Sequence, residues 1–352
     1  MDTAHITTVD TLKHYLHLAM QLEHATIPPY LMALYSIRPG TNSDATHVLR
    51  VVAVEEMLHL TLAANLLNAI GGEPNLTAPG FVPSYPASLP DGERDFQVSL
   101  ERFSKEAIET FLKIERPAGV ADGISRRRKK RVSGVQLAAV PGDDSMSFYS
   151  IGEFYEEIGH GLRLLYQKMG DDLFRGDPKR QATSEYYYSG GGELFAVTGM
   201  ESAEAAIKLI TGQGEGLGGG IYDAERELAH YYRFEQLKLG RYYQAGDKPH
   251  EPTGPKLHVD WEAVYPVKTN ARLGDYRSSP ELHEAAVAFN QTYGKFLAAL
   301  TEAYNGEPGV LLRAVPEMFR VRDGVLQLMH NPVPGSDGVN AAPTFEIGEA
   351  RA

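Results

Sequence analysis

The chain has 352 residues, of which 43% are hydrophobic and 23% are charged, which is ordinary for one large globular domain or for a domain with an extension. The net charge of −12 argues against a nucleic-acid partner, and the absence of cysteine excludes disulfides, iron–sulfur clusters and thiolate zinc sites. No apolar run is long enough to span a membrane and the amino terminus has no secretion signal, so we expect a cytoplasmic protein with no membrane partner.

The amino-terminal part of the sequence predicts two long helices. Apolar residues recur at helical spacing over residues 8–38. Pro28-Pro29 interrupts this pattern, and we expect a kink just after Glu23. A second helix is expected over residues 43–70, where a Gly-Gly pair ends it.

Residues 73–148 form a proline-rich insert with little periodicity. It contains a short predicted helix over residues 104–114, with a serine at its start. Six consecutive basic residues follow at 126–131, in a stretch flanked by glycine and serine. We interpret this basic run as a solvated loop. The alternative is a cationic rim that attracts an anionic substrate.

The next segments predict the second half of a bundle. Long helices are expected over residues 147–169 and 222–239, and a short one over 202–211. A Tyr- and Gly-rich stretch at 185–199 is suited to a small hairpin. The glycine loop at 212–220 lacks the Lys-Ser/Thr ending of a phosphate-binding loop, so we interpret it as a flexible approach to the following helix.

The carboxyl-terminal third predicts two further helices after a loop-like segment. The first is expected over residues 280–304, with an apolar face, and a weaker one over 311–329. The sequence therefore predicts an all-α protein in which residues 1–245 form a bundle with inserts. Residues 246–352 would form a helical extension packed on that bundle.

Two Glu-x-x-His pairs carry the functional prediction. They are Glu56 with His59 and Glu227 with His230. Residues i and i+3 share a helix face, so each pair can direct a carboxylate and an imidazole at one metal ion. Two such pairs, with one glutamate from each of two other helices, form the ligand set of a di-iron or di-manganese four-helix bundle. One pair alone could be an ordinary Glu/His pair on the surface of an amphipathic helix. That interpretation does not explain four helices that each offer a carboxylate within an apolar stripe.

The two single glutamates come from the first and third long helices. Glu23 lies on an otherwise apolar stripe, where an unpaired carboxylate is costly. The third helix offers Glu153, Glu157 and His160 on one face. We prefer Glu153, because the bundle needs a single glutamate there. The alternative is Glu157 with His160 as a third Glu-x-x-His pair.

The predicted site holds two metal ions in a set of oxygen and nitrogen ligands. The proposed ligands are Glu23, Glu56, His59, Glu153, Glu227 and His230. Glu56 and Glu227 are the candidates for bridging the metals, because each lies beside its own histidine. This set suits Fe(II) with O2 or peroxide as co-substrate, and Mn or Zn would accept the same ligand types. Tyr30 and Tyr231 lie within a turn of predicted ligands and could hydrogen-bond to bound oxygen.

Four segments carry a resemblance to a known family. They are Gln21-Leu-Glu-His-Ala-Thr-Ile-Pro-Pro-Tyr-Leu31, Glu55-Glu-Met-Leu-His-Leu60, Ile151-Gly-Glu-Phe-Tyr155 and Glu227-Leu-Ala-His-Tyr-Tyr-Arg-Phe234. From about residue 12 to 240 the chain resembles the ferritin-like domain of the iminophenylpyruvate dimer synthase family, whose much longer enzymes act in violacein- and indolocarbazole-type pathways. The resemblance implies a ferritin-like four-helix bundle with a dimetal site, favours Glu153 over Glu157, and implies oxidative coupling of amino-acid-derived imines.

The sequence therefore predicts a non-haem di-iron oxidoreductase of secondary metabolism. Its substrate would be a small organic molecule, amino-acid-derived or aromatic, and the protein could be a homodimer. The alternatives are a ferroxidase or iron-handling protein, and a metal-bound module without turnover. A cavity lined by Met20, Ile27, Tyr30 and Phe234 would favour the oxidoreductase, whereas a carboxylate-lined channel would favour iron handling.

Overall fold

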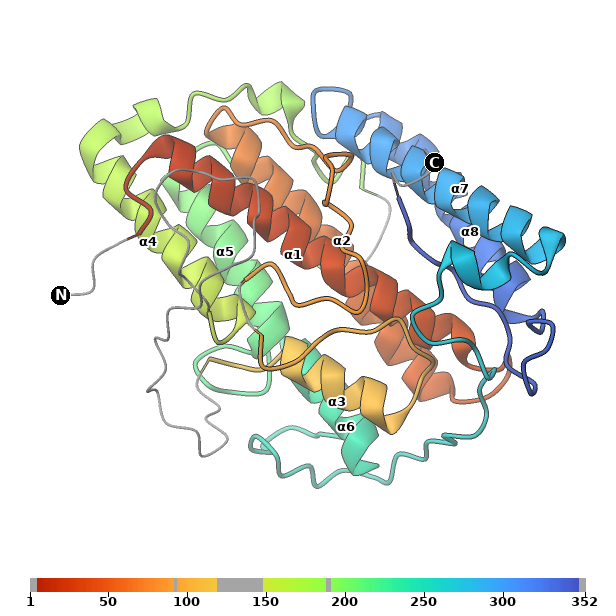
Figure 1. Ribbon diagram of the computed structural model, residues 1–352. Helices are drawn as coiled ribbons and strands as arrows, with labels where there is room; N and C mark the ends of the chain where they lie inside the picture. The colour runs from red at the N-terminus through yellow and green to blue at the C-terminus, as the bar shows by residue number, and fades with distance from the viewer. Residues whose placement is uncertain (1–4, 92–93, 119–147, 188–190, 348–352) are drawn as a thin grey trace.

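The computed structural model describes residues 5–91, 94–118, 148–187 and 191–347, and every regular element in these ranges is helical. Four helices lie lengthwise against one another and form the bundle (Figure 1). They are α1 (Val9–Ser36), α2 (Ser43–Ala69), α4 (Ile151–Met169) and α5 (Met200–Glu215). None of the described helices is both long and apolar enough to cross a membrane.

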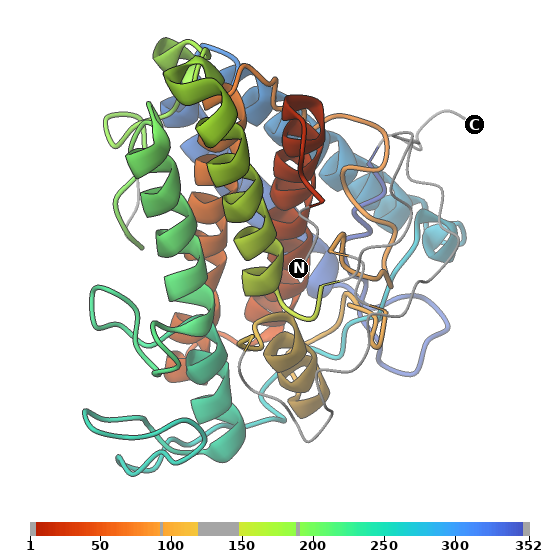
Figure 2. The ribbon, with the colours of Figure 1, turned by 90° about the vertical axis from the view of Figure 1, so that its left-hand side faces the viewer.

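Two shorter helices lengthen one end of the bundle. In both ribbon views α3 (Lys105–Ile114) lies beyond the end of α4, and α6 (His230–Leu239) lies beyond the end of α5 (Figures 1 and 2). α3 and α6 also pack against each other. α1 and α2 are thus continuous, whereas each of the other two positions in the bundle is filled by two helices in succession. The helix ends at this junction can direct side chains into the bundle interior.

The carboxyl-terminal part packs against the bundle as a helical hairpin. α7 (Pro280–Ala303) and α8 (Val310–Met329) lie side by side, with short 3₁₀ helices elsewhere at 170–173, 178–180 and 273–276. Buried hydrogen bonds join the hairpin to the bundle. His24 Nε2 lies 2.8 Å from the Tyr293 hydroxyl, and Asn68 Nδ2 donates to the Tyr304 carbonyl at 2.6 Å. The hairpin therefore covers α1 and α2.

Most predicted helices match the observed ones to within a few residues, and the largest difference is at α6. A helix was expected from residue 222, but α6 begins at His230. The Asp223 carboxylate accepts hydrogen bonds from the backbone N–H groups of Glu225 and Glu227, and Arg226 has a φ of +65°. This side-chain-capped turn competes with helix formation, so the chain before His230 is not helical.

Three further expectations concern the segments between helices. The helix expected over 202–211 is longer, because α5 includes the first residues of the glycine loop and ends at Glu215. The described residues of 185–199 contain no strand, so the predicted hairpin is not found there. The basic run at 126–131 lies outside the described residues.

Pro28 and Pro29 lie inside α1, which continues as one helix through both. Because proline has no N–H group, Pro29 leaves the carbonyl of Ala25 without its helical partner. The Tyr85 hydroxyl donates to this carbonyl at 2.8 Å. The insert therefore supplies the hydrogen bond that the proline removes, one turn from Glu23.

Replacing Tyr85 with Phe should destabilise the protein by about 1–3 kcal/mol, because the buried Ala25 carbonyl would lose its partner. Urea unfolding of the two proteins measures the difference. Tyr35→Phe is the matched control, since the described structure gives the half-buried Tyr35 hydroxyl no hydrogen bond. Equal losses in both variants would contradict this role of Tyr85.

Candidate metal centre

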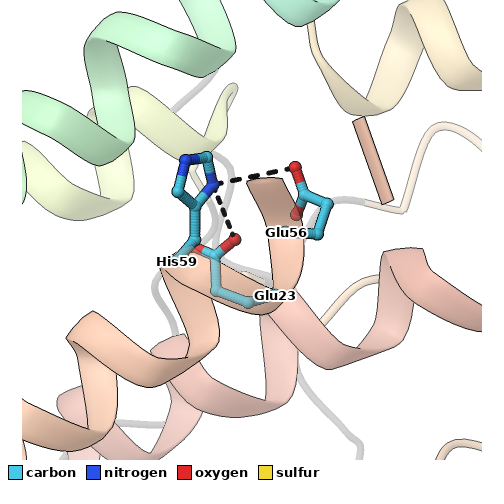
Figure 3. A group of neighbouring side chains, drawn as sticks. All are labelled: Glu23, Glu56 and His59. Atoms are coloured by element: carbon cyan, nitrogen blue, oxygen red, sulfur yellow. Dashed lines mark ion pairs between the residues drawn. The ribbon is translucent and has the colours of Figure 1, made fainter. Parts of the chain in front are cut away.

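The first half of the site is built by α1 and α2. Glu23 comes from α1, and Glu56 and His59 come from one face of α2 (Figure 3). His59 Nδ1 lies 3.6 Å from Glu23 Oε2 and 3.7 Å from Glu56 Oε1. All three side chains are buried, and their potential ligand atoms lie within 4.8 Å of one another. These distances leave room for one ion at the centre of the group.

The second half is built where the short helices join the bundle. Glu115 is the C-terminal cap of α3, and His230 is the first residue of α6. His230 Nδ1 lies 3.0 Å from Glu56 Oε1 and 3.4 Å from Glu115 Oε2. Glu56, Glu115 and His230 form a second buried group of potential ligands. Glu56 belongs to both groups, and its position is that of a carboxylate able to bridge two metal ions.

The hydrogen bonds of the two imidazoles show which nitrogen faces the site. Gln213 Nε2 donates to the Gly191 carbonyl at 2.6 Å, so Gln213 Oε1 is free to accept from His59 Nε2 at 2.8 Å. The Glu55 carboxylate likewise accepts from His230 Nε2 at 2.8 Å. With Nε2 protonated in both rings, a neutral imidazole presents the Nδ1 lone pair to the carboxylates. Metal-binding histidines are typically held in this way by an outer hydrogen bond.

Each of the three central carboxylates is fixed by a hydroxyl at one oxygen and faces a histidine Nδ1 with the other. The donors are Tyr155 to Glu23 Oε1 (2.5 Å), Thr26 to Glu56 Oε2 (3.0 Å), and Tyr30 to Glu115 Oε1. The hydroxyls leave free the oxygens that a metal would need. Tyr30 is thus placed beside the site, as its sequence position suggested, through Glu115.

The site is electrostatically costly when no cation is present. Burial, and next the negative charge of Glu115, raise the pKa of Glu56 to about 8. Burial alone would lower the pKa of His59, but Glu23 and Glu56 outweigh it and the pKa is raised. His230 behaves in the same way, and its carboxylate neighbours raise its pKa well above the ordinary value. Without a metal ion the site therefore retains protons.

The buried Nδ1 of His230 has no hydrogen-bond partner among the described residues, although two carboxylate oxygens lie close to it. A metal ion between these lone pairs would satisfy the nitrogen and the oxygens together. Oxygen and imidazole ligands without sulfur suit Fe, Mn or Zn. The donor set therefore fits a pair of such ions.

A narrow cavity reaches the centre from the junction of α4 and α5. It has room for about one water molecule. Its lining includes Glu23, Glu56, His59, Glu115, Ile151, Gly152, Ile210, Thr211, Gly214 and Glu215. Glu215 accepts hydrogen bonds from the backbone N–H groups of Gly152 (2.7 Å) and Ala118 (3.0 Å), which ties α5 to the start of α4. Met20, Tyr30 and Phe234 are packed in the core and do not line this cavity.

Four of the six ligands predicted from the sequence meet at the centre, and Glu153 and Glu227 do not. Glu153 lies in the first turn of α4, where its carboxylate accepts from the backbone N–H of Tyr149 at 2.9 Å. Glu227 precedes α6, and its side chain is 68% exposed. It lies 3.9 Å from Arg233 and is absent from both groups.

The alternative residues of α4 lie elsewhere as well. The Glu157 carboxylate accepts from the backbone N–H groups of His5 (2.9 Å) and Ile6 (3.3 Å), and His160 is 59% exposed beside it. α4 instead contributes Tyr155, which binds Glu23. Tyr231, which sequence proximity placed near the site, packs against Tyr232 and His250.

The sequence interpretation missed Glu115 and Gln213. Glu115 follows a short helix in the proline-rich insert, which was not counted in the bundle. The available signal was a glutamate directly after the apolar face of that helix, at Ile114-Glu115. Glu55 lies beside Glu56 in the sequence, but its contact with His230 depends on the fold. Gln213 lies in the glycine-rich segment, where nothing in the pattern indicates burial.

Comparison with known proteins finds a family model, an enzyme and a solved structure that are similar to this chain. A family model described as Ferritin-like matches residues 16–239. Dichlorochromopyrrolate synthase of Lentzea aerocolonigenes is 25% identical over 325 residues, which are 85% of this chain but 29% of that enzyme. The chain therefore spans less than a third of this relative. The crystal structure of a ferritin-like protein from Caulobacter vibrioides is similar with a TM-score of 0.63, at 22% identity, over 96% of this chain and 98% of that one. The predicted all-α, ferritin-like fold is confirmed.

The metal-free protein should lose stability as the pH rises from 6.5 to 8. Glu56, His59 and His230 all have folded-state pKa values above their unfolded values, so over this range the folded state binds more protons than the unfolded state. Thermal unfolding in the presence of a chelator measures the effect. In Glu56→Gln, which cannot titrate at this position, the decline should be smaller. A melting temperature that rises over this range would contradict the assignment.

Proposed function

Because the chain belongs to the ferritin-like family, we propose that it binds two metal ions, iron in its active form, and oxidises a small organic substrate with O2 or peroxide. One observation supports this most directly. Glu56 is shared by two buried groups, and in each a histidine presents Nδ1 to carboxylate oxygens that no hydroxyl occupies. The proposed ligands are Glu23, Glu56, His59, Glu115 and His230.

A bound iron pair would supply the electrons for reducing the oxidant, which side chains cannot supply. The chain's own residues would hold the site in shape. Tyr155, Thr26 and Tyr30 orient the three carboxylates, so the ligands need little rearrangement when metal binds. The cavity beside His59 admits a molecule about as large as water, which suits the oxidant, and Ile151 and Ile210 give it an apolar wall.

The substrate class is supported by similarity. The relative from Lentzea aerocolonigenes is a synthase, and four motifs of this chain resemble a family acting on amino-acid-derived imines. We therefore propose an aromatic or amino-acid-derived substrate in secondary metabolism. The long material outside the bundle, including α7 and α8, is consistent with an enzyme that handles more than iron.

Iron handling is the second candidate, and one observation favours it. The cavity that reaches the centre is lined by four glutamates, Glu23, Glu56, Glu115 and Glu215, which would attract cations. A ferroxidase would oxidise Fe(II) at the same ligands but would need no organic substrate. The two candidates therefore differ in how much iron passes through the site.

Metal analysis tests the ligand set. Wild-type protein should bind about two ions per chain, and Glu115→Gln, His59→Ala and His230→Ala should each lose at least one. Glu153→Gln and Glu227→Gln are the matched controls and should retain both, because their carboxylates lie outside the centre. Loss of metal from these two variants, with retention in Glu115→Gln, would restore the ligand set predicted from the sequence.

Iron uptake in air tests the choice between the two candidates. Reduced protein is given excess Fe(II) and O2, and iron per chain and particle mass are measured. We expect about two irons per chain in a small oligomer, with O2 uptake stimulated by an aromatic or amino-acid-derived substrate. Dozens of irons per chain in a large shell would show iron storage instead.

A further inference from the structure

The two halves of the centre have the same types of ligand but different surroundings. The His59 half consists of Glu23, His59 and the shared Glu56, and the His230 half consists of Glu115, His230 and the same Glu56. Each half thus offers one carboxylate of its own, the shared carboxylate and one imidazole. Any difference in affinity between the halves must therefore come from what surrounds these ligands.

The outer partners of the two imidazoles differ in charge. His59 Nε2 is bound by the neutral amide of Gln213, whose orientation is fixed by its bond to Gly191. His230 Nε2 is bound by the Glu55 carboxylate, which is 4% exposed. An anionic acceptor behind an imidazole makes its other nitrogen a stronger donor to a metal than a neutral amide does. The His230 half should therefore bind a cation more tightly.

Arg233 reduces this difference without removing it. Its NH2 group lies 3.4 Å from Glu55 Oε1, whereas the other oxygen, Oε2, accepts from His230 at 2.8 Å. The closer and stronger contact is the one to the imidazole. The arginine thus helps to hold Glu55 in place while one of its oxygens remains bound to His230.

Access to the two halves also differs. All three ligands of the His59 half line the cavity that reaches the centre, whereas in the His230 half Glu56 and Glu115 line it and His230 does not. A cation in the His59 half would have every ligand at the cavity, whereas one in the His230 half would have its imidazole outside the cavity lining. The charge of the outer partner and the position of the cavity therefore both favour tighter binding of a metal ion in the His230 half.

We propose that the His230 half binds its metal first and more tightly, that Glu55 is the positioning residue that sets this order, and that the His59 half holds the exchangeable metal beside the cavity. This inference rests on the two-metal site of the proposed function. It adds an order of loading and a residue that controls it.

Titration of metal-free protein with Co²⁺ alone tests the order. His59→Ala leaves the His230 half with its histidine, and His230→Ala leaves the His59 half. We expect the remaining Co²⁺ to bind at least about tenfold more tightly to His59→Ala than to His230→Ala. Adding Glu55→Gln to His59→Ala should weaken Co²⁺ binding by about ten- to a hundredfold, the usual effect of losing an outer partner of a metal-binding histidine.

Two controls separate this effect from general damage. Glu235→Gln changes a different buried glutamate, which lies on α6. Glu235 binds Tyr243 and His250 and lies outside both groups. Placed in the His59→Ala background, it should leave the Co²⁺ affinity unchanged. Wild-type protein should show two stepwise constants, and Glu55→Gln alone should weaken the first constant more than the second. This second measurement needs no histidine variant to fold.

The outcomes distinguish a failure of the proposed order of loading from a failure of the proposed two-metal site. Failure of wild-type protein to bind Co²⁺ would refute the proposed two-metal site. Binding of two Co²⁺ ions with equal constants, or tighter binding by His230→Ala, would overturn the order of loading alone. An unchanged affinity in Glu55→Gln, or an equal loss in Glu235→Gln, would overturn the role of Glu55.

Discussion

The structure depends on the burial of three carboxylates side by side in the interior of a helical bundle. Glu23, Glu56 and Glu115 are each at most 3% exposed, and the burial of such charges is costly unless they are paired. The surrounding hydroxyls compensate only one oxygen of each. The remaining oxygens face two imidazole nitrogens, and protons or metal ions must balance the charge between them. The helix ends, the capping turns and the outer hydrogen bonds around the centre all serve to hold these groups in that arrangement.

Two positions of the bundle are each filled by two successive helices, α3 with α4 and α5 with α6, and this division allows the buried carboxylates and imidazoles to meet. A continuous helix presents side chains only at helical spacing, so it can place a carboxylate and a histidine i and i+3 on one face, as α2 does with Glu56 and His59. At the junction of α3 with α4 and of α5 with α6, side chains come from helix ends. Glu115 closes α3 and His230 opens α6, and both side chains are buried together at the centre. The same junction contains the narrow cavity.

Sequence periodicity was sufficient for α1 and α2, because long amphipathic helices determine which faces are buried, and Glu23, Glu56 and His59 followed from that. It also identified His230 but gave it the wrong local context. A helical pattern through residues 222–229 looked continuous, whereas the side chain of Asp223 stabilises a turn that places Glu227 outside the helix. Glu153 satisfied the expected spacing, yet it caps the first turn of its own helix. Glu115 directly follows the apolar face of a short helix, but its role depends on a tertiary contact between α3 and α6 that this local pattern does not record.

The origin of the central residues along the chain has a consequence for assembly. Glu23 and His230 lie near opposite ends of the segment that matches the family model, and Glu56 and Glu115 lie between them. Bringing them together closes a chain loop that includes nearly the whole bundle. The chain loses conformational entropy when this loop closes, and the stabilising contacts at the centre form only afterwards. The centre would therefore be among the last parts of the bundle to form during synthesis. An ion that joins its two halves would act as a late cross-link, whose dissociation frees both ends of the loop at once.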